Sequence, residues 1–587
     1  MKCVLGGVGL TFLLLNSVPL NSVPISPLSS FVARASGEDP ISNLKGPASY
    51  QWPASPGPGY GGVYIEDDIS HTRRVSTLSI PSKNLLCSST TETSCADQAV
   101  QFYAILPRCV SSDSVDCIES ISVKSSAGAI EQAQFERYFP EQGLADFTGS
   151  AEAKIPSGAS SSLWNIPSAP HAGGNEYLAV VSVSGSADSR RNVIQSPIVH
   201  ASLYPVQIVA GKFSRNVPFG NGGVSHRSVD PWANCASIDE GYCAARQEFP
   251  SSIRFSMAIR LSSSPNGWLH GRIFDPEISF TKSDSFVRIQ IEADPVQVPA
   301  IATWTEAALL PKSYGTVCTG TINCPQSNPQ SDGAVSSVED WRALYQDKAS
   351  WTRTQWFFQT LRDSPLESQN SIACFGDKSL LQGFVTTNAA GYSAGPPSYS
   401  TSEKAFRYTV SSPHFDAESK VLIGTYSFVI RTSTARCLYG IEDGDISAKL
   451  TISASDRGDI TETLTESVSI DSTWLKVNAT GFHYSSPVIK TSLWSSATAK
   501  KPTVTTKKTA TAKAFANYAK LTVEATSTVT LKVSAASKKY CTVVSTKVKG
   551  VTTVNLKGLK KGTCKVTVTV TPKTGAPKNS TITLKIT

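Results

Sequence analysis

The chain has 587 residues and a net charge of +8 at neutral pH, and 17% of its residues are charged. The charge is unevenly placed: residues 497–587 contain 18 Lys and one acidic residue, Glu524, so they carry +17 and leave −9 on the first 496. This division indicates partners rather than a fold, because a cationic end favours an anionic polymer or surface. There is no H-E-x-x-H and no P-loop, which argues against zinc proteases and P-loop nucleotide hydrolases.

Residues 1–35 have the pattern of a secretory signal peptide. Residues 4–15 form an apolar run too short to span a bilayer well, and Ala33-Arg34-Ala35 fits a cleavage site. A buried N-terminal strand is the alternative, which three prolines in the segment disfavour. No second apolar run of membrane length follows. We therefore expect a secreted or cell-surface protein with no transmembrane segment after cleavage.

Twelve cysteines follow the signal, and an even number in an exported chain predicts disulfides. We expect nearest neighbours to pair, because short separations suit bridges between adjacent strands or loop ends. Crossed pairing among the first four stays open. With no C-x-x-C and seven scattered His, the sequence favours neither a metal site nor a cofactor. The expected pairs are Cys87–Cys95, Cys109–Cys117, Cys235–Cys243, Cys318–Cys324, Cys374–Cys437 and Cys541–Cys564.

The sequence predicts a mainly β fold of several antiparallel β-sandwich-like domains, with one short helical insertion and a C-terminal immunoglobulin-like (Ig-like) sandwich. Short alternating runs broken by Ser, Gly, Asp and Pro support it. The expected segments are a signal peptide (1–35), a linker (36–62), a β domain (63–215), a β domain with a meander (216–335), a helical segment (336–364), a β domain (365–491), a Ser/Thr/Lys linker (492–513) and a basic Ig-like domain (514–587).

Strands are expected along the whole body, and residues 235–243 are expected to form a polar loop closed by a disulfide. The clearest strands form a meander in which Asp275-Pro276 is a turn between two of them. The expected strands are 75–80, 99–106, 177–183, 198–209, 253–261, 268–274, 278–280, 287–291, 379–387, 406–411, 420–431, 446–454 and 462–470.

One segment departs from this pattern. Ser336 and Glu339 have the spacing of a capping box, and apolar residues follow at helical spacing, which predicts a helix over residues 338–348. Whether Trp351 and residues 356–358 extend this helix or begin a strand stays open.

The C-terminal segment alternates Thr and Val with Lys, which predicts six short strands with lysines on their outer faces. Lys557, Lys560 and Lys561, in or beside a Gly-bounded turn, are candidate ligand-binding residues. The expected strands are 520–525, 528–533, 542–548, 552–556, 565–571 and 581–586.

Stretches of this chain resemble an uncharacterised family of secreted actinobacterial surface proteins that end in a small Ig-like module. The resemblance implies location and architecture, and it supplies no catalytic residues. The stretches are KYCTVVSTKVKG (539–550), LKGLKKGTCKVTVTVTPK (556–573), DDISHTRR (67–74), GWLHGRIFDPEISF (267–280), ARCLYG (435–440) and GFHYSSPVIK (481–490).

Trp268, His270 and Arg272 alternate along one expected strand, so their side chains should share a face. An exposed face of this kind suits a sugar or an anionic group. The alternative, which we favour, is that Trp268 packs in the core beside a hydrogen-bonded His.

Three further patterns are weak. Residues 57–62 match G-x-G-x-x-G without a preceding strand or a following helix, and Ser393 in GYSAG matches a nucleophile elbow without a helix-forming segment after it. We expect plain turns at both. Glu442, Asp443 and Asp445 are acidic enough for a calcium site, although a simple turn is the favoured interpretation.

These observations favour a non-enzymatic, envelope-associated protein whose Lys-rich tail binds an anionic cell-wall or extracellular polysaccharide. Specific nucleic-acid binding is disfavoured, because the tail has no Arg and few aromatic residues. The alternative is a secreted carbohydrate-active or other hydrolytic enzyme with an accessory Ig-like domain. That alternative requires a pocket with convergent carboxylates or a catalytic triad.

Overall fold

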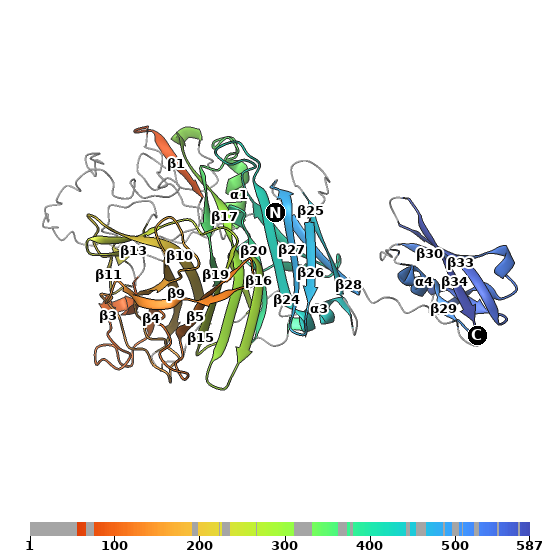
Figure 1. Cartoon of the computed structure of the whole chain (residues 1–587), viewed down its shortest axis with the longest axis horizontal. Helices are drawn as coiled ribbons and strands as arrows, with labels where there is room; N and C mark the ends of the chain where they lie inside the picture. Colours follow the sequence, from red (N-terminus) through yellow and green to blue (C-terminus); the bar gives the residue numbers. More distant parts are fainter. Residues whose placement is uncertain are drawn as a thin grey trace, which may run out of the picture. The chain divides into compact units, whose positions relative to one another are not determined.

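The computed structural model describes most of the chain after residue 55, and the structural statements below concern that part alone. Within it the chain is mainly β, with antiparallel sheets and short helices, as the sequence predicts (Figure 1). No helix in these ranges has the length and apolarity needed to cross a membrane. The ranges are 56–65, 75–188, 190, 198–221, 224–225, 235–265, 267–309, 332–361, 373–375, 380–441, 446–453, 465–484, 488–495, 504–506, 509–519, 521, 527–548, 551–572 and 576–587.

One sheet, here called the long sheet, combines strands from the three predicted β domains of the body. Its pairs are antiparallel except for one parallel pair, β16 with β20. Strands β7 (Gln134–Phe139) and β8 (Ser161–Asn165) join it beside β9. In spatial order its strands are β3 (Leu85–Leu86), β2 (Thr77–Ile80), β4 (Val100–Ile105), β9 (Glu176–Ala187), β10 (Ile198–Ala210), β19 (Phe357–Thr360), β16 (Gly267–Lys282), β20 (Leu381–Thr387), β24 (Ile423–Arg431), β27 (Trp474–His483) and β26 (Thr465–Ile470).

A second sheet packs against the first half of the long sheet. The far end of β17 also pairs with β1 (Tyr60–Ile65) and β18 (Trp351–Gln355). Apolar residues of the two sheets, such as Val181 of β9 and Ile259 of β15, meet in a first core. The second sheet contains, in order, β6 (Ile130–Gln132), β5 (Cys117–Ser125), β15 (Ile253–Leu261), β17 (Val287–Glu306) and the second half of β16.

A third sheet packs against the other half of the long sheet and forms a second core. Strand β24 shows how one strand serves both cores: Phe428 and Ile430 point into the second core, and Val429 between them points into the first. The third sheet contains β21 (Gly391–Tyr392) and β22 (Ser398–Ser400), which both pair with β23 (Ala405–Ser411), followed by β28 (Val488–Ser495) and β25 (Ile446–Ser453).

Strand β16 belongs to two sheets. Its first residues pair with β19 and β20 in the long sheet, and its last residues pair with β17 in the second sheet. The register breaks between Phe274 and Glu277, where Asp275 takes a left-handed φ of 51°. The prediction of two strands separated by a turn at Asp275-Pro276 was therefore wrong, because the chain bends there and stays one strand. We call this place the fork.

The predicted helix begins six residues earlier than expected. Helix α1 spans Asp332–Asp340, so the supposed capping box lies inside it. It does not continue to residue 348, because Gln346 and Asp347 take left-handed φ values of 55° and 58°. The Asp347 carboxylate is held by Arg342 at 2.9 Å and by His414 at 2.5 Å. Of the aromatic residues after it, Trp351 begins β18, Phe357 and Phe358 lie in β19, and Trp356 lies between the two strands, so they do not extend the helix.

Short helices that the sequence did not predict complete the described elements. Helix α3 (Thr432–Tyr439) follows β24 and ends at Gly440, whose φ of 63° suits glycine. Other short elements of the body are η1 (Pro81–Lys83), η2 (Ala307–Leu309), η4 (Ala373–Phe375), and the pair β11 (Val217–Pro218) and β12 (Val224–Ser225).

Five of the six expected disulfides are present, and the expected bridge between Cys318 and Cys324 lies outside the described residues. The crossed alternative among the first four cysteines was therefore wrong. Residues 235–243 are not a polar loop: β13 (Cys235–Asp239) and β14 (Tyr242–Arg246) form a hairpin whose two cysteines are fully buried. Strand β14 also pairs antiparallel with the last residues of β10.

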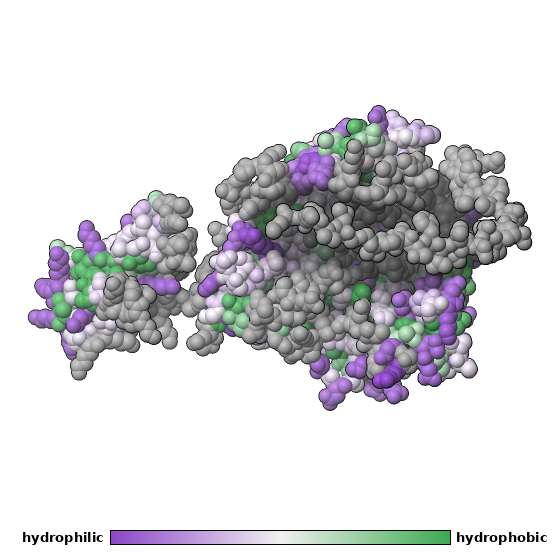
Figure 2. Space-filling view, turned by 180° about the vertical axis from the view of Figure 1, so that it is seen from behind, coloured by the Kyte–Doolittle hydropathy of each residue, from purple (hydrophilic) through white to green (hydrophobic). Residues whose placement is uncertain are grey.

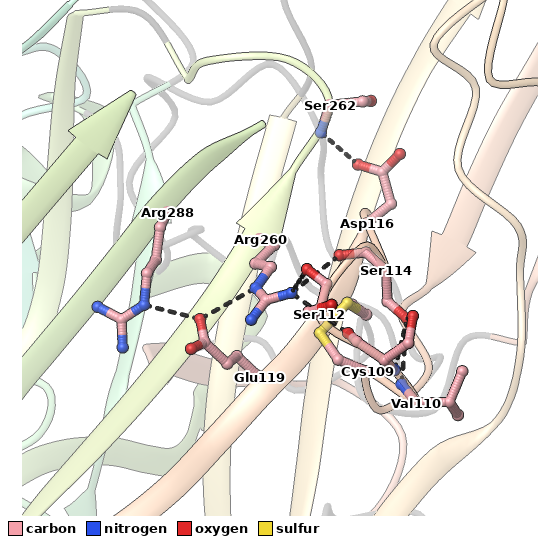
Figure 3. The surroundings of a disulfide bond; sticks show 11 residues. Cys109, Val110, Ser112, Ser114, Asp116, Glu119, Arg260, Ser262 and Arg288 are labelled. Carbon is pink, nitrogen blue, oxygen red and sulfur yellow. Dashed lines mark hydrogen bonds and ion pairs between the residues drawn. A yellow bond between two sulfur atoms is a disulfide. The ribbon is translucent and has the colours of Figure 1, made fainter. Parts of the chain in front are cut away.

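Figure 3 shows how side chains fix the loop that the Cys109–Cys117 bridge closes. Arg260 donates from Nη1 to the carbonyls of Ser111, Ser112 and Ser114 at 3.3, 2.5 and 3.4 Å. Its Nε reaches Glu119 at 3.2 Å, and Glu119 also binds Arg288 at 2.7 Å. Arg260 thus ties the backbone carbonyls of the loop to strand β15; the Ser111 carbonyl also accepts the N–H of Ser114 at 3.3 Å.

The C-terminal module has two three-stranded sheets with a hydrophobic core of their own. The sheet orders, β29-β32-β31 and β30-β33-β34, match strands B-E-D and C-F-G of the Ig fold. Five of the six predicted strands are present; of the sixth, 520–525, only Leu521 is described, and the other residues lie outside the described part. The elements are β29 (Ala510–Thr511), α4 (Ala512–Tyr518), β30 (Thr528–Val533), η5 (Ala535–Ser537), β31 (Cys541–Val548), β32 (Val551–Gly558), β33 (Gly562–Thr571) and β34 (Lys578–Ile586).

The two expected linkers are shorter than predicted. Strand β1 begins at Tyr60, inside the first one. Strand β28 continues to Ser495, and β29 and α4 begin at Ala510 and Ala512, inside the second. Val504 is already buried in the core of the C-terminal module.

Candidate functional site

Ten described lysines of the C-terminal module are exposed. On the strands they alternate with buried Val, Leu, Ile and Cys, as the sequence predicts. At the left of Figure 2, hydrophilic side chains line the outer rim of the module. The exposed lysines are Lys513, Lys532, Lys538, Lys539, Lys557, Lys560, Lys561, Lys565, Lys578 and Lys585.

Strand pairing brings seven of these lysines to one end of the module. The turn after β32 folds against Tyr540, whose carbonyl accepts the N–H groups of Leu559 and Lys560 at 2.8 and 3.3 Å. In β33, Thr563 lies opposite Lys585, and the Lys565 N–H donates to Ser537 Oγ at 2.9 Å. We call this set the basic end; it consists of Lys538, Lys539, Lys557, Lys560, Lys561, Lys565 and Lys585.

The basic end has no acidic side chain nearby in sequence or in the described part of the module. Glu524, the module's single acidic residue, lies outside the described residues. Lys539 Nζ lies 5.0 Å from the centre of the Tyr540 ring, a cation–π contact. Uncompensated ammonium groups raise the local concentration of anions, and their field falls off over a Debye length of about 8–10 Å in physiological salt.

The sequence identified three members of the basic end, Lys557, Lys560 and Lys561. It did not identify the other four, because their proximity depends on strand register and on the fold of η5 against β33. The sequence does show the +17 charge of the whole segment, but a net charge does not indicate which lysines lie close together in the fold.

The strand GWLHGR lies inside the protein. Trp268, His270 and Arg272 share a face of β16, as predicted, and they are 2%, 0% and 0% exposed. Trp268 belongs to the second core, 5.9 Å from Phe428. His270 stacks on Tyr392 with ring centres 3.8 Å apart. A face this completely covered offers no surface to a ligand, so the packing interpretation is the better one.

Arg272 binds the segment that follows β20. Its Nη1 donates to the carbonyls of Thr387 and Ala389 at 3.0 and 2.5 Å, and its Nη2 reaches the carbonyl of Ala390 at 3.5 Å. The guanidinium also lies 4.6 Å from the centre of the Tyr392 ring. Arg272 therefore has a structural role: it satisfies buried carbonyls between two sheets.

His270 differs from the expected hydrogen-bonded core histidine. Neither of its ring nitrogens has a hydrogen-bond partner among the described residues. Burial holds the pKa of His270 well below its ordinary value of 6.5, and the nearby Arg272 charge lowers it further. The imidazole is therefore neutral in the folded protein.

This burial predicts a pH-dependent stability. The unfolded chain binds a proton at His270 below pH 6.5 and the folded protein does not, so the free energy of unfolding falls by up to about 1.4 kcal/mol per pH unit as pH drops below that value. Above it the effect is absent. The measurement compares urea unfolding of wild type and His270→Phe, which keeps the stack on Tyr392. Parallel pH profiles for the two proteins would contradict the prediction.

The other sequence patterns do not assemble a site. Ser393 follows β21, a two-residue strand, and its Oγ donates to the Thr409 carbonyl at 3.3 Å, which is not the geometry of a strand-to-helix elbow. The G-x-G-x-x-G segment runs into β1 rather than a helix. Glu442, Asp443 and Asp445 lie outside the described residues, and no group of three metal-ligating side chains occurs within those that are described.

Comparison with protein-family models, curated proteins and solved structures found no match to this chain. The resemblance to secreted actinobacterial surface proteins therefore stays a prediction, and the functional argument depends on the geometry of this chain.

Proposed function

We propose that this is a secreted, non-enzymatic, cell-envelope-associated protein that binds an anionic surface polysaccharide through the basic end of its C-terminal module. The observation that carries the proposal is the set of seven exposed lysines at one end of the module, with no acidic side chain among the module's described residues. Such a set suits a polyanion, whose repeated charges can contact several ammonium groups together.

Two features of the whole chain support an extracellular role. Five disulfides in a chain are typical of an oxidising compartment, and the first 35 residues have the pattern of a secretory signal. Lysine ammonium groups are point charges without the planar fork of Arg, so the site should discriminate weakly among anionic polymers. Because the attraction is between exposed charges, which salt screens, binding should weaken in high salt.

Two matched double variants test whether binding depends on the position of the lysines or only on the net charge of the module. We expect Lys560→Glu with Lys561→Glu, in the basic end, to weaken binding to an immobilised polyuronic acid by at least about 30-fold, since each lysine near an anionic surface contributes about 1 kcal/mol and the new carboxylates repel the polymer. Lys513→Glu with Lys578→Glu changes the net charge equally at exposed sites outside the basic end and should have a much smaller effect. Biosensor binding at low and high salt measures both.

Binding to purified envelopes at low and high salt is then compared for three proteins: the full chain, a chain ending at residue 503 and the isolated module. We expect the module alone to bind and the shortened chain to lose most of the affinity. Undiminished binding by the shortened chain, salt-independent binding, or equal loss in the two double variants would show that the basic end is not the site. Hydrolysis of the polysaccharide by the full chain would instead support the enzymatic alternative.

A further inference from the structure

A groove runs along β16 beyond the fork. Its volume is about 410 Å³, which falls in the range of about 300–1,000 Å³ that is usual for ligand sites. One wall consists of residues 276–279 of β16 with β17 beside them, and the other consists of the β26–β27 hairpin. Side chains of consecutive strand residues point to opposite faces, so a groove that contacts four residues in succession follows the edge of the strand.

This edge of β16 is open within the described part of the chain. Residues 277–282 pair antiparallel with residues 287–292 of β17 on one side, and no described strand pairs with them on the other. In an antiparallel pair every second residue directs its N–H and C=O away from the partner strand. The edge therefore presents backbone donors and acceptors, which is the feature that an extended segment of another chain pairs with when it adds to a sheet.

The position of the open edge is fixed by polar contacts around Asp275. Its N–H donates to Ser427 Oγ at 3.2 Å, and its carboxylate binds Lys476 at 2.6 Å. Arg254 donates to the Asp275 carbonyl at 2.8 Å. A left-handed φ at a residue other than glycine persists only where the surroundings determine it, so the edge separates from the long sheet at a fixed place.

The lining of the groove is net negative. Lys476 is its one cation, and this side chain is already bound to Asp275. One of the carboxylates is also compensated, because Arg254 binds Glu292 at 3.2 Å. The acidic residues of the lining are Glu277, Glu292 and Asp471.

Two carboxylates of the lining have no cationic partner among the described residues. Glu277 is exposed and lies on the open edge itself. Asp471, in the turn of the β26–β27 hairpin, is also exposed. Its Oδ1 accepts the N–H groups of Thr473 and Trp474 at 2.6 and 2.7 Å, which leaves Oδ2 for another donor. Both walls of the groove thus offer an acceptor for an ammonium group.

We propose that the groove binds an extended, lysine-bearing segment of another protein, which adds as a strand to the open edge of β16. The unpaired backbone groups select a peptide, because a peptide backbone has the matching donors and acceptors at the matching spacing. The uncompensated carboxylates select lysine, because a residue opposite Glu277 in the added strand has its side chain on the same face. The proposal goes beyond the basic end and does not depend on it.

The first test compares capped octapeptides on the full chain by calorimetry. We expect a peptide of alternating Lys and Thr to bind at one site, and a peptide of alternating Glu and Thr not to bind measurably. Two further forms carry N-methyl groups on all Thr or on all Lys residues. Alternate amides of a strand point to opposite edges, so one form should lose binding by about tenfold or more and the other should keep it.

The second test changes the protein and uses the Lys/Thr peptide as the probe. Glu277→Lys should weaken binding about fivefold, because an exposed ion pair is replaced by a repulsion of similar size. Glu418→Lys, at an exposed residue outside the groove, is the matched control and should bind like wild type. In wild type, the amides of residues 277–282 that point away from β17 should exchange more slowly with solvent when the peptide is bound.

Four outcomes would overturn the proposal. The first is that the Lys/Thr peptide does not bind at millimolar concentration. The second is that both N-methylated forms bind as tightly as the parent peptide, which would leave charge attraction without strand pairing. The third is an equal loss of affinity in Glu277→Lys and Glu418→Lys. The fourth is self-association of the full chain that Glu277→Lys abolishes, which would assign the edge to a second copy of this chain.

A failure of this proposal is distinguishable from a failure of the basic-end proposal. The full chain with Lys560→Glu and Lys561→Glu should bind the Lys/Thr peptide like wild type, because these lysines do not line the groove. Loss of peptide binding in this double variant would also count against the groove as the binding site.

Discussion

Replacing Trp268 with alanine should lower the free energy of unfolding by about 3–5 kcal/mol, because it empties a large volume in the second core. Trp268 is 2% exposed, and the centre of its ring lies 5.9 Å from that of Phe428 and 6.2 Å from that of Phe406. The neighbouring strand is shaped around it. A Cβ added at Gly383 would lie 2.3 Å from an atom of the Trp268 ring, so this position accepts no side chain.

Chemical denaturation measures the effect, and Gly383→Ala should destabilise the protein through the same contact from the opposite side. Ile423→Ala is the control: Ile423 is 44% exposed on β24, and its truncation should change stability by less than about 0.5 kcal/mol. An unchanged unfolding midpoint in Trp268→Ala would contradict the packing role and would reopen GWLHGR as a functional strand.

Much of the sheet structure could be predicted because strand periodicity is local. Residues 253–261 and 528–533 were predicted with the bounds of β15 and β30, since polar and apolar side chains alternate there without interruption. Nearest-neighbour disulfides followed in the same way from short separations, because a hairpin, as at Cys235–Cys243, or a short loop, as at Cys109–Cys117, brings such cysteines together.

The elements that could not be predicted depend on partners distant in sequence. Helix α3 has only eight residues and is fixed by a disulfide from Cys437 to Cys374, 63 residues earlier. The fork at Asp275 depends on Ser427 and Lys476, more than 150 residues later. A left-handed Asp beside Pro has the local pattern of a turn, and only these contacts show that the strand continues.

The candidate site divides in the same way. Charge composition located the cationic module, but the gathering of Lys538 and Lys585 with the turn lysines depends on register. For GWLHGR, alternation correctly placed three side chains on one face, while burial of that face depends on the third sheet.

The C-terminal module, residues 504–587, should fold alone and should depend on its disulfide. Its core draws on both sheets, and Cys541 in β31 is bonded to Cys564 in β33, so the bridge joins the two sheets directly. Both cysteines are fully buried. Closing a loop of this length stabilises a domain by about 3–3.5 kcal/mol in the chain-entropy description. Domains of this size bury a smaller fraction of their surface on folding than large domains do, so they have little stability in reserve.

We therefore expect the isolated module to show a cooperative unfolding transition, and Cys541→Ala with Cys564→Ala to remove most or all of it. Ser545→Ala with Thr563→Ala changes exposed residues on the same two strands and should unfold like wild type. Because the turn of the basic end folds against Tyr540, next to Cys541, loss of the bridge should also abolish binding to the polyuronic acid. A disulfide-free module that unfolds at the wild-type denaturant concentration would show that the two sheets hold together without the bridge, and binding by that module would show that the lysines need no fixed arrangement.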